Sequence, residues 1–250
     1  MDPRGLSAAE VLEAVDAGAG KDMAARGRVL FAAGAPELPD ELLDEFSLGS
    51  RDASILALRC ATFGDVLAAR VACPACGLRL SVKVPRSVVT VPRPGPASPP
   101  PATIRIEDGR FVVEARLVDG RILASAAACP DTTTARAALV TGCICSALED
   151  GRPVDPLDLD EAVVARIGDA LVAADPQAEV TVTMSCAGCG AEWSALLDIV
   201  DFFWREIAAL SVQLLDDVHE LALGYGWSEE QVLRLSSRRR REYVERLAGD

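Results

Sequence analysis

The sequence has few of the residues on which acid–base and metal-dependent catalysis rely. Of its 250 residues, His219 is the only histidine, and aromatic residues make up 4% of the chain. A histidine-rich catalytic metal site is therefore excluded, and any Ser–His or Cys–His mechanism would depend on one residue within a predicted helix. No Gly-x-Ser-x-Gly motif is present. These absences predict a protein that is not an enzyme and has no small-molecule substrate.

Long apolar runs are also missing. No hydrophobic segment reaches the length of about 18 residues needed to span a membrane, and the N-terminus lacks the features of a signal peptide. We therefore expect a cytoplasmic protein in a thiol-reducing compartment, where paired cysteines favour metal or redox chemistry over disulfides. The formal net charge of −13 argues against nucleic-acid binding, because phosphate backbones repel an acidic surface.

Hydrophobic periodicity indicates an α+β fold, in which helices at both ends of the chain surround a small strand-rich centre. Half of the residues are hydrophobic, so the chain can build a sizeable core. The predicted segments, in chain order, are a helical region at 1–71, a first cysteine hairpin at 72–90, a Pro-rich linker at 91–102, β-hairpin strands at 103–128, a helical insertion at 129–177, a second cysteine hairpin at 178–200 and C-terminal helices at 201–250.

Three local expectations follow from turn and capping signals. Apolar residues at helical spacing predict one long helix over 50–72. Asp-Gly turn signals at 108–109 and 119–120 predict strands on both sides of each turn. A further helix is expected to begin near Asp131 and to end at Gly151.

The strongest motif is a repeated Cys-x-x-Cys-Gly turn. CPACG at 73–77 is matched by CAGCG at 186–190, and each lies where an alternating β pattern reverses direction. In a zinc knuckle, such a turn brings two thiolates to one metal, and the glycine adopts the left-handed backbone that the turn needs. Two turns supply the four thiolates of a closed tetrahedral site. We therefore predict a zinc-ribbon-like β centre with one structural Zn²⁺ bound by Cys73, Cys76, Cys186 and Cys189.

Other uses of these cysteines stay open. A thioredoxin-like redox pair would need its Cys-x-x-Cys at a helix N-terminus, and one pair would be sufficient. Two local disulfides are disfavoured by a reducing compartment. Four thiolates also bind ferrous iron, so the sequence does not separate Zn²⁺ from Fe²⁺. The remaining cysteines are predicted to pack as small hydrophobic residues, namely Cys60, Cys129, Cys143 and Cys145.

Candidate partner-binding residues lie in the C-terminal part of the acidic chain. Trp204 belongs to an aromatic run whose members cannot all face one core, and Trp227 precedes a predicted helix. A basic cluster is either a solvated helix end balanced by nearby glutamates or a docking site for an acidic protein surface. The cluster consists of four consecutive arginines, Arg238, Arg239, Arg240 and Arg241.

Two blocks of the sequence resemble a known family. The first lies around 53–77, and the more specific one, at 174–247, has a Cys-x-x-Cys before Trp193, an aromatic run before Glu-Ile, a Val-His and a Tyr-Gly-Trp. These blocks resemble proteins related to the T-even phage baseplate hub assembly chaperones, which occur with phage tails and phage-derived extracellular contractile injection systems. The Pro-rich segment and the strands expected at 103–126 are not part of the resemblance.

The resemblance implies a non-enzymatic protein that assists or joins baseplate assembly, with baseplate hub or tape-measure proteins as its partners. A permanent structural subunit of the baseplate is an alternative. A zinc-ribbon regulatory or nucleic-acid-associated protein is another, but the segment after the second cysteine pair carries Glu192 and Asp198 where basic residues would be expected. An enzyme that uses cysteine chemistry would need an activated thiolate among the remaining cysteines.

Overall fold

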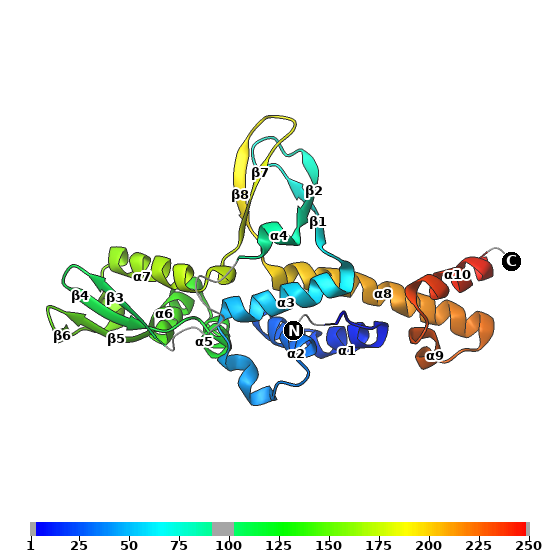
Figure 1. The fold of residues 1–250 in the computed structure, drawn as a ribbon, viewed down its shortest axis with the longest axis horizontal. Helices are drawn as coiled ribbons and strands as arrows, with labels where there is room; N and C mark the ends of the chain where they lie inside the picture. Colours follow the sequence, from blue (N-terminus) through cyan, green and yellow to red (C-terminus); the bar gives the residue numbers. More distant parts are fainter. Residues whose placement is uncertain (1–3, 92–102, 249–250) are drawn as a thin grey trace.

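The computed structural model describes residues 4–91 and 103–248. Figure 1 shows a central helical body, two β-hairpins that rise from it, a lobe with a four-stranded sheet at one end, and the C-terminal helices at the other. The combination of helices and small sheets confirms the predicted α+β class. The linker predicted at 91–102 lies, apart from Val91, outside the described residues. Within the described ranges, no helix is long and apolar enough to cross a membrane.

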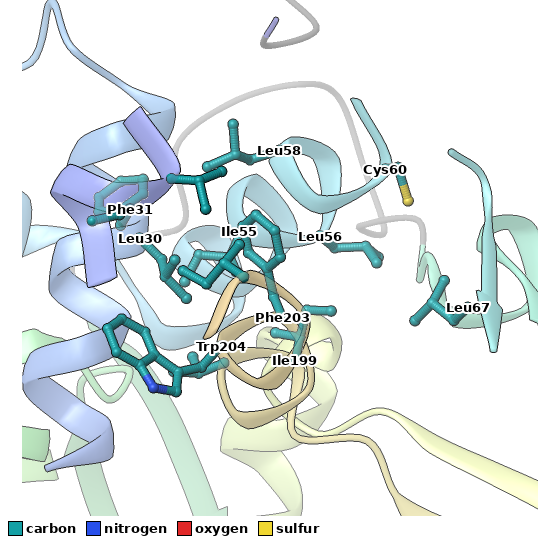
Figure 2. Packing of buried hydrophobic residues seen from close by; sticks show 14 of the residues in the cluster. Leu30, Phe31, Ile55, Leu56, Leu58, Cys60, Leu67, Ile199, Phe203 and Trp204 are labelled. Carbon is teal, nitrogen blue, oxygen red and sulfur yellow. The ribbon is translucent and has the colours of Figure 1, made fainter. Parts of the chain in front are cut away.

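The central body is built by α1 (Ala8–Gly18), α2 (Met23–Gly34), α3 (Leu48–Phe63) and α8 (Ile199–Tyr225), with the short 3₁₀ helix η1 (Asp40–Glu45) between α2 and α3. Their apolar faces meet in one core, in which Leu30, Ile55 and Phe203 are fully buried (Figure 2). The long helix α8 packs against each of the other three helices. It therefore forms the floor on which the hairpins stand.

The two hairpins are separate antiparallel pairs. β1 (Val66–Ala72) pairs with β2 (Arg79–Pro85), which leads into the short helix α4 (Arg86–Val89), and β7 (Thr181–Ser185) pairs with β8 (Glu192–Leu196). Among the described strands, none of the first hairpin pairs with one of the second. Leu67, Val89 and Val180 are buried in the main core and fix the bases of the hairpins to the body.

The lobe has a sheet with the strand order β3 (Ile104–Asp108), β4 (Phe111–Ala115), β5 (Ile144–Glu149) and β6 (Arg152–Pro153). Its own core includes Val113, Ala115 and Val163. The segments around the sheet are α5 (Gly120–Ala127), α6 (Thr132–Cys143), η2 (Pro156–Asp158), α7 (Glu161–Ala174) and η3 (Pro176–Ala178).

The helix predicted over 50–72 is wrong beyond Phe63. α3 ends there because Gly64 adopts a φ of +91°, in the left-handed region that favours glycine. The residues that follow form β1, although alanine and arginine are good helix formers. Antiparallel pairing with β2 along the whole of β1 overrides that local preference.

Two expectations in the lobe are also wrong. No strand follows the second Asp-Gly signal, because the Asp119 carboxylate accepts a hydrogen bond from the Ile122 N–H at 2.8 Å and thereby caps helix α5. The helix that begins after Asp131 ends at Cys143, well before Gly151. The residues after it form β5, which lies between β4 and β6 in the sheet.

The C-terminal helices α9 (Glu229–Leu233) and α10 (Ser237–Ala248) fold back against α8. Gly226 ends α8 with a left-handed φ of +67°. Ser228 and Gln231 then form a capping box that begins α9. The end of α8 opposite the lobe is therefore covered on one side by these two short helices (Figure 1).

Candidate metal centre

The two cysteine turns at the tips of the hairpins have the same backbone design. In each turn, the N–H of the first cysteine donates to the carbonyl five residues later, and the glycine N–H donates to the carbonyl of the first cysteine, at 2.8–2.9 Å. Gly77 and Gly190 adopt φ angles of +72° and +73°. The glycine of each Cys-x-x-Cys-Gly motif therefore allows the chain to reverse direction with both sulfurs on one side.

The four sulfur atoms predicted as ligands come together. The Sγ atoms of Cys73, Cys76, Cys186 and Cys189 all lie within 4.8 Å of one another. The contacts between the hairpins are 3.7 Å, for Cys73 with Cys189 and for Cys76 with Cys186. A tetrahedron with metal–sulfur distances of about 2.3 Å has sulfur–sulfur edges of about 3.8 Å. The residues thus fit one tetrahedral metal ion, which would leave no open position for a substrate.

The thiols of the cluster strongly affect one another. The N–H groups of Cys189 and Gly188 stabilise the thiolate of Cys186 and lower its pKa to about 7. The N–H of Leu78 lowers the pKa of Cys76, but the sulfurs of the other three cysteines outweigh it and raise the pKa to about 12. The first thiolate therefore forms readily, whereas the neighbouring sulfurs oppose the ionisation of a second thiol. A cation at the centre would remove this opposition, because it stabilises the thiolates together.

Direct packing between the two turns adds to the sulfur contacts. A Cβ atom at position 188 would lie 2.8 Å from a methyl carbon of Leu78, so Gly188 allows the second turn to approach the first closely. This pair could not be predicted, because Gly188 occupies one of the two variable positions of its Cys-x-x-Cys motif and Leu78 is one of many leucines.

A buried ion pair supports the base of the first hairpin. The Arg59 guanidinium is 2% exposed and lies 2.6 Å from the Glu206 carboxylate of α8. It also donates to the carbonyls of Gly64 and Val66, at 2.7 and 3.1 Å, just where the chain turns from α3 into β1. Sequence reasoning missed this contact. Its one signal was an arginine beside apolar residues of a predicted helix.

Gln177 links the bases of the two hairpins. Its side-chain amide donates to the carbonyl of Val89, at 3.1 Å, and its carbonyl accepts from the N–H of Val91, at 2.8 Å. Val89 and Val91 follow the first hairpin, while Gln177 lies shortly before β7 in the second. The two hairpins are therefore tied at their bases by hydrogen bonds and at their tips by the cysteines.

An apolar groove of about 560 Å³ opens between the hairpins. Val71 and Val82 line one wall, Met184 and Ala195 line the other, and the first turns of α8 form the floor around Phe202. Val71 and Val82 share one face of the first hairpin, and Met184 and Ala195 share one face of the second, because alternate residues of a strand point to the same side.

The structure does not support Trp204 as a partner-binding residue. Trp204 is 7% exposed and lies among the buried residues of the main core (Figure 2). Its ring lies against Gly18 of α1, and the Arg26 guanidinium lies 4.7 Å from the ring centre. The prediction is wrong because the aromatic run straddles two helix faces, and Trp204 is on the face that packs against the core.

The arginine cluster is divided by the structure. Arg240 is buried, and its guanidinium forms an ion pair with Asp217 of α8 at 2.8 Å, so its assignment as a partner contact is wrong. Arg238, Arg239 and Arg241 are exposed on α10. Because consecutive residues surround a helix axis, one of the four had to face α8.

Trp227 belongs to an aromatic group at the end of α8. Its ring stacks on Tyr225 at 4.8 Å and meets Tyr243 of α10 edge-on at 4.9 Å. Tyr225 is 39% exposed and Trp227 is half-buried. The group therefore joins α8 to α10 and still presents part of its surface to solvent.

The remaining cysteines differ in their surroundings. Cys60 and Cys143 are buried as predicted, and burial raises the pKa of both thiols, that of Cys143 to about 11. Cys145 is exposed and Cys129 is partly so, which differs from the core packing expected of them. His219 is exposed on α8.

The fold and the site together define a helical protein that carries two cysteine hairpins able to share one metal ion. The family model described as T4 bacteriophage base plate protein matches residues 37–204, well over half of the chain. The chain therefore belongs to this family of baseplate proteins. No curated protein and no solved structure matched the chain.

The matched span differs from the resemblance noted in the sequence. It includes both hairpins, all four clustered cysteines and the sheet of the lobe, which the resemblance left out. It ends at Trp204, so most of the stretch at 174–247 lies beyond it. The match thus covers the hairpins, the lobe and α3, while α1, α2, most of α8 and the two C-terminal helices lie outside it.

Proposed function

We propose that this protein is a non-enzymatic assembly chaperone or adaptor for the baseplate hub of a contractile, phage-tail-like injection system. The observation that carries the proposal is the family match, which runs through both hairpins and the cysteine centre. A closed four-thiolate site suits a role in folding rather than in catalysis, because all its coordination positions are filled by protein.

The metal of the centre is, in this proposal, a structural zinc ion. Support comes from the sulfur spacing of 3.7 Å and from the four-thiolate donor set, which zinc favours. Ferrous iron accepts the same donor set, so metal analysis of the purified protein has to separate the two. The protein would acquire its metal in the cytoplasm, where thiols stay reduced.

The proposed partners are baseplate hub or tape-measure proteins, and the C-terminal helices are the proposed contact surface. Arg238, Arg239 and Arg241 are exposed on α10, the helix whose Tyr243 contacts the partly exposed rings of Tyr225 and Trp227. Arginine, tyrosine and tryptophan are the residues that most often dominate binding energy at protein interfaces. An acidic surface on the partner would complement this basic end of an otherwise acidic chain.

Quantitative mass spectrometry of the native host lysate tests the proposal. The lysate is separated into purified tail-like particles and soluble protein, and the chain is quantified in each together with the proteins that co-purify with it. We expect the chain in the soluble fraction, bound to a hub or tape-measure protein, and absent from finished particles.

A stoichiometric amount in finished particles would instead identify a permanent structural subunit of the baseplate. If no tail protein accompanied the chain in either fraction, the proposal would be overturned altogether. An Arg239→Glu/Arg241→Glu variant serves as an internal comparison, because it should weaken partner binding without changing the core.

A further inference from the structure

The open edge of β1 borders the groove between the hairpins. Every residue of β1 from 67 to 71 lines the groove, whereas β2 contributes only the alternate residues Val82 and Val84. Alternate residues of a strand share one face, so Ala68 and Arg70 point to the face opposite to that of the valines. The side chain of Ala68 is a single methyl group on that other face, so this residue reaches the groove through its backbone.

The hydrogen bonds at the two ends of the β1–β2 ladder show where the backbone groups point. At the tip, the N–H of Cys73 donates to the carbonyl of Leu78, at 2.9 Å. At the base, the N–H of Arg86 donates to the carbonyl of Asp65, at 2.7 Å. Pairs along an antiparallel ladder alternate between hydrogen-bonded and non-hydrogen-bonded, so the odd-numbered residues of β1 bond to β2. The even-numbered residues therefore direct their N–H and carbonyl groups away from β2, at the open edge.

The second hairpin has the same arrangement on its side of the groove. The N–H of Leu197 donates to the carbonyl of Val180, at 2.8 Å, so the preceding residue Leu196 directs its own backbone groups away from β7. Leu196 lines the groove, whereas β7 contributes only the alternate residues Val182 and Met184. The groove is therefore bordered by two open strand edges, with apolar side chains between them.

The face of the first hairpin that carries Arg70 is basic. Lys83 and Arg79 lie on this face as well, because they pair across the ladder with Ala68 and Ala72. All three basic residues are exposed, and none of them forms an ion pair within the part of the chain that the structure describes. A strand added to the edge of β1 would therefore have three positive charges beside one of its own faces.

We propose that the edge of β1 binds an extended segment of a partner protein, which adds a strand to the first hairpin and fills the groove. The segment pairs with the open N–H and carbonyl groups of Ala68 and Arg70, and every second side chain is apolar and lies between Val82 and Met184. Its other side chains are acidic, because opposite charges on neighbouring strands stabilise their pairing. A β1 strand of a second copy would instead bring like charges together, so the basic face disfavours self-pairing.

Binding of synthetic peptides to the full-length, metal-loaded chain tests the proposal. Labelled heptapeptides match the seven residues of β1. The first alternates valine with glutamate, the second alternates valine with lysine, and the third is the glutamate peptide with N-methyl groups on alternate backbone nitrogens, prepared in both phases. We expect the glutamate peptide to bind at least about tenfold more tightly than the lysine peptide and than one or both N-methylated forms. It should also slow the amide hydrogen exchange of Ala68 and Arg70, whose N–H groups it covers.

Two proline variants test the edge. Ala68→Pro removes an N–H that points away from β2, which an edge strand tolerates, and it should weaken binding of the glutamate peptide about tenfold. Ser81→Pro is the matched control, because Ser81 pairs with Arg70 and its N–H points to the outer edge of β2, which does not line the groove. This variant should bind the peptide as the native chain does.

Charge reversal tests the acidic partner. Arg70→Glu should weaken binding of the glutamate peptide and strengthen that of the lysine peptide, because the charge beside the added strand is reversed. Metal content and thermal unfolding show whether each variant is folded, and if Ala68→Pro is not, the N-methylated peptides make the same test on the native chain.

Three results would overturn the proposal. The first is a glutamate peptide that does not bind, or that binds no better than the lysine peptide. The second is binding that leaves exchange at Ala68 and Arg70 unchanged, which would indicate a helix or another ligand in the groove. The third is a chain whose β1 edge is already protected in a self-associated form without peptide.

Discussion

Two aspartates from other segments, Asp175 and Asp198, act on the buried pair of Arg51 and Asp52 at the junction of body, lobe and hairpins. The Asp52 side chain is 14% exposed and pairs with Arg51 at 3.0 Å. Burial raises the pKa of Asp52 to about 6; Arg51 partly offsets this effect, and Asp198 and Asp175 add to it. Asp198 caps α8, and Asp175 follows α7 and accepts a hydrogen bond from the Gly49 N–H. An ionised Asp52 therefore opposes folding at neutral pH.

The variant Asp52→Asn should be more stable than the native protein at pH 7. The rise from 3.8 to about 6 corresponds to about 3 kcal/mol. Because the folded-state pKa of this acid is raised, the favourable contribution of its neutral form is complete below pH 3.8 and is lost as the pH rises through 6. Asparagine cannot ionise, so the gain should reach up to about 3 kcal/mol at pH 7 and vanish near pH 4. Denaturant unfolding at both values measures it, and a pH-independent difference would contradict the assignment.

The variant Cys186→Ser should lose the metal. Serine removes one of four thiolates, and three thiolates do not complete the closed tetrahedral shell. We expect metal content to fall from one ion per chain to nearly none, as measured by elemental mass spectrometry, which also identifies zinc or iron. The free energy of unfolding should fall by about 3 kcal/mol or more, the effect of losing a ligand held at about a hundredfold excess over its Kd.

The matched control for this experiment is Cys145→Ser. Cys145 is exposed and lies outside the sulfur cluster. Its substitution should leave both metal content and stability unchanged. A Cys186→Ser variant that kept its metal and its stability would refute the four-thiolate centre.

At the scale of the elements, replacing either of two helical glycines by alanine should change the stability of the protein in opposite directions. A Cβ atom at position 18 would overlap the Trp204 ring, where α1 crosses α8, whereas one at position 168 in α7 meets open space. Gly18→Ala should therefore destabilise the protein by about 1–3 kcal/mol through overpacking. Gly168→Ala should stabilise it by about 0.5–1 kcal/mol, because alanine loses less backbone entropy in a helix. Thermal unfolding of both variants measures the contrast, and equal signs would contradict this packing.

The secondary structure was predictable where local and tertiary forces agree. The alternation of residues 79–85 and 181–185 indicated strands, and the structure has strands there. It was not predictable where strand pairing overrides local preference. β1 and β5 contain helix-compatible residues such as Ala68, Arg70 and Leu148. Each becomes a strand because it pairs with another strand, β1 with β2 and β5 with β4.

The cluster of Cys73, Cys76, Cys186 and Cys189 could be found from the sequence because its chemistry is concentrated in four residues at fixed spacing. Its supports could not, because Arg59, Glu206 and Gln177 have no motif and act through contacts made by folding. The assignment of Trp204 failed for a related reason. Composition shows that an aromatic run exists, but only the packing of α1 and α2 against α8 decides which ring is buried.

In the whole molecule, the hairpins form a distinct layer on the helical body (Figure 1). Their bases are fixed by buried residues of the main core, such as Leu67 and Val180, but their tips are joined through the cysteine turns. A two-stranded hairpin is only marginally stable by itself. The stability of this layer should therefore depend on the metal, while that of the body should not.

Removal of the metal by a chelator should open the hairpins locally and leave the body folded. Amide hydrogen exchange should accelerate by about tenfold or more over residues 66–85 and 181–196, equal to about 1.4 kcal/mol of lost local protection. Exchange within α3 and α8 should stay slow. Re-addition of zinc is the control and should restore protection. Acceleration of all regions together would contradict a local role and indicate global unfolding.

The distance between the two cysteine pairs along the chain imposes an order on synthesis. Cys73 and Cys189 are 116 residues apart, and at about 5–20 residues per second the second pair leaves the ribosome roughly 6–23 s after the first. During that interval the first turn offers two thiolates without their partners, and the whole lobe is synthesised. Capture of the proposed metal by all four thiolates would therefore be a late event, and a closed centre would mark a chain whose lobe has already been made.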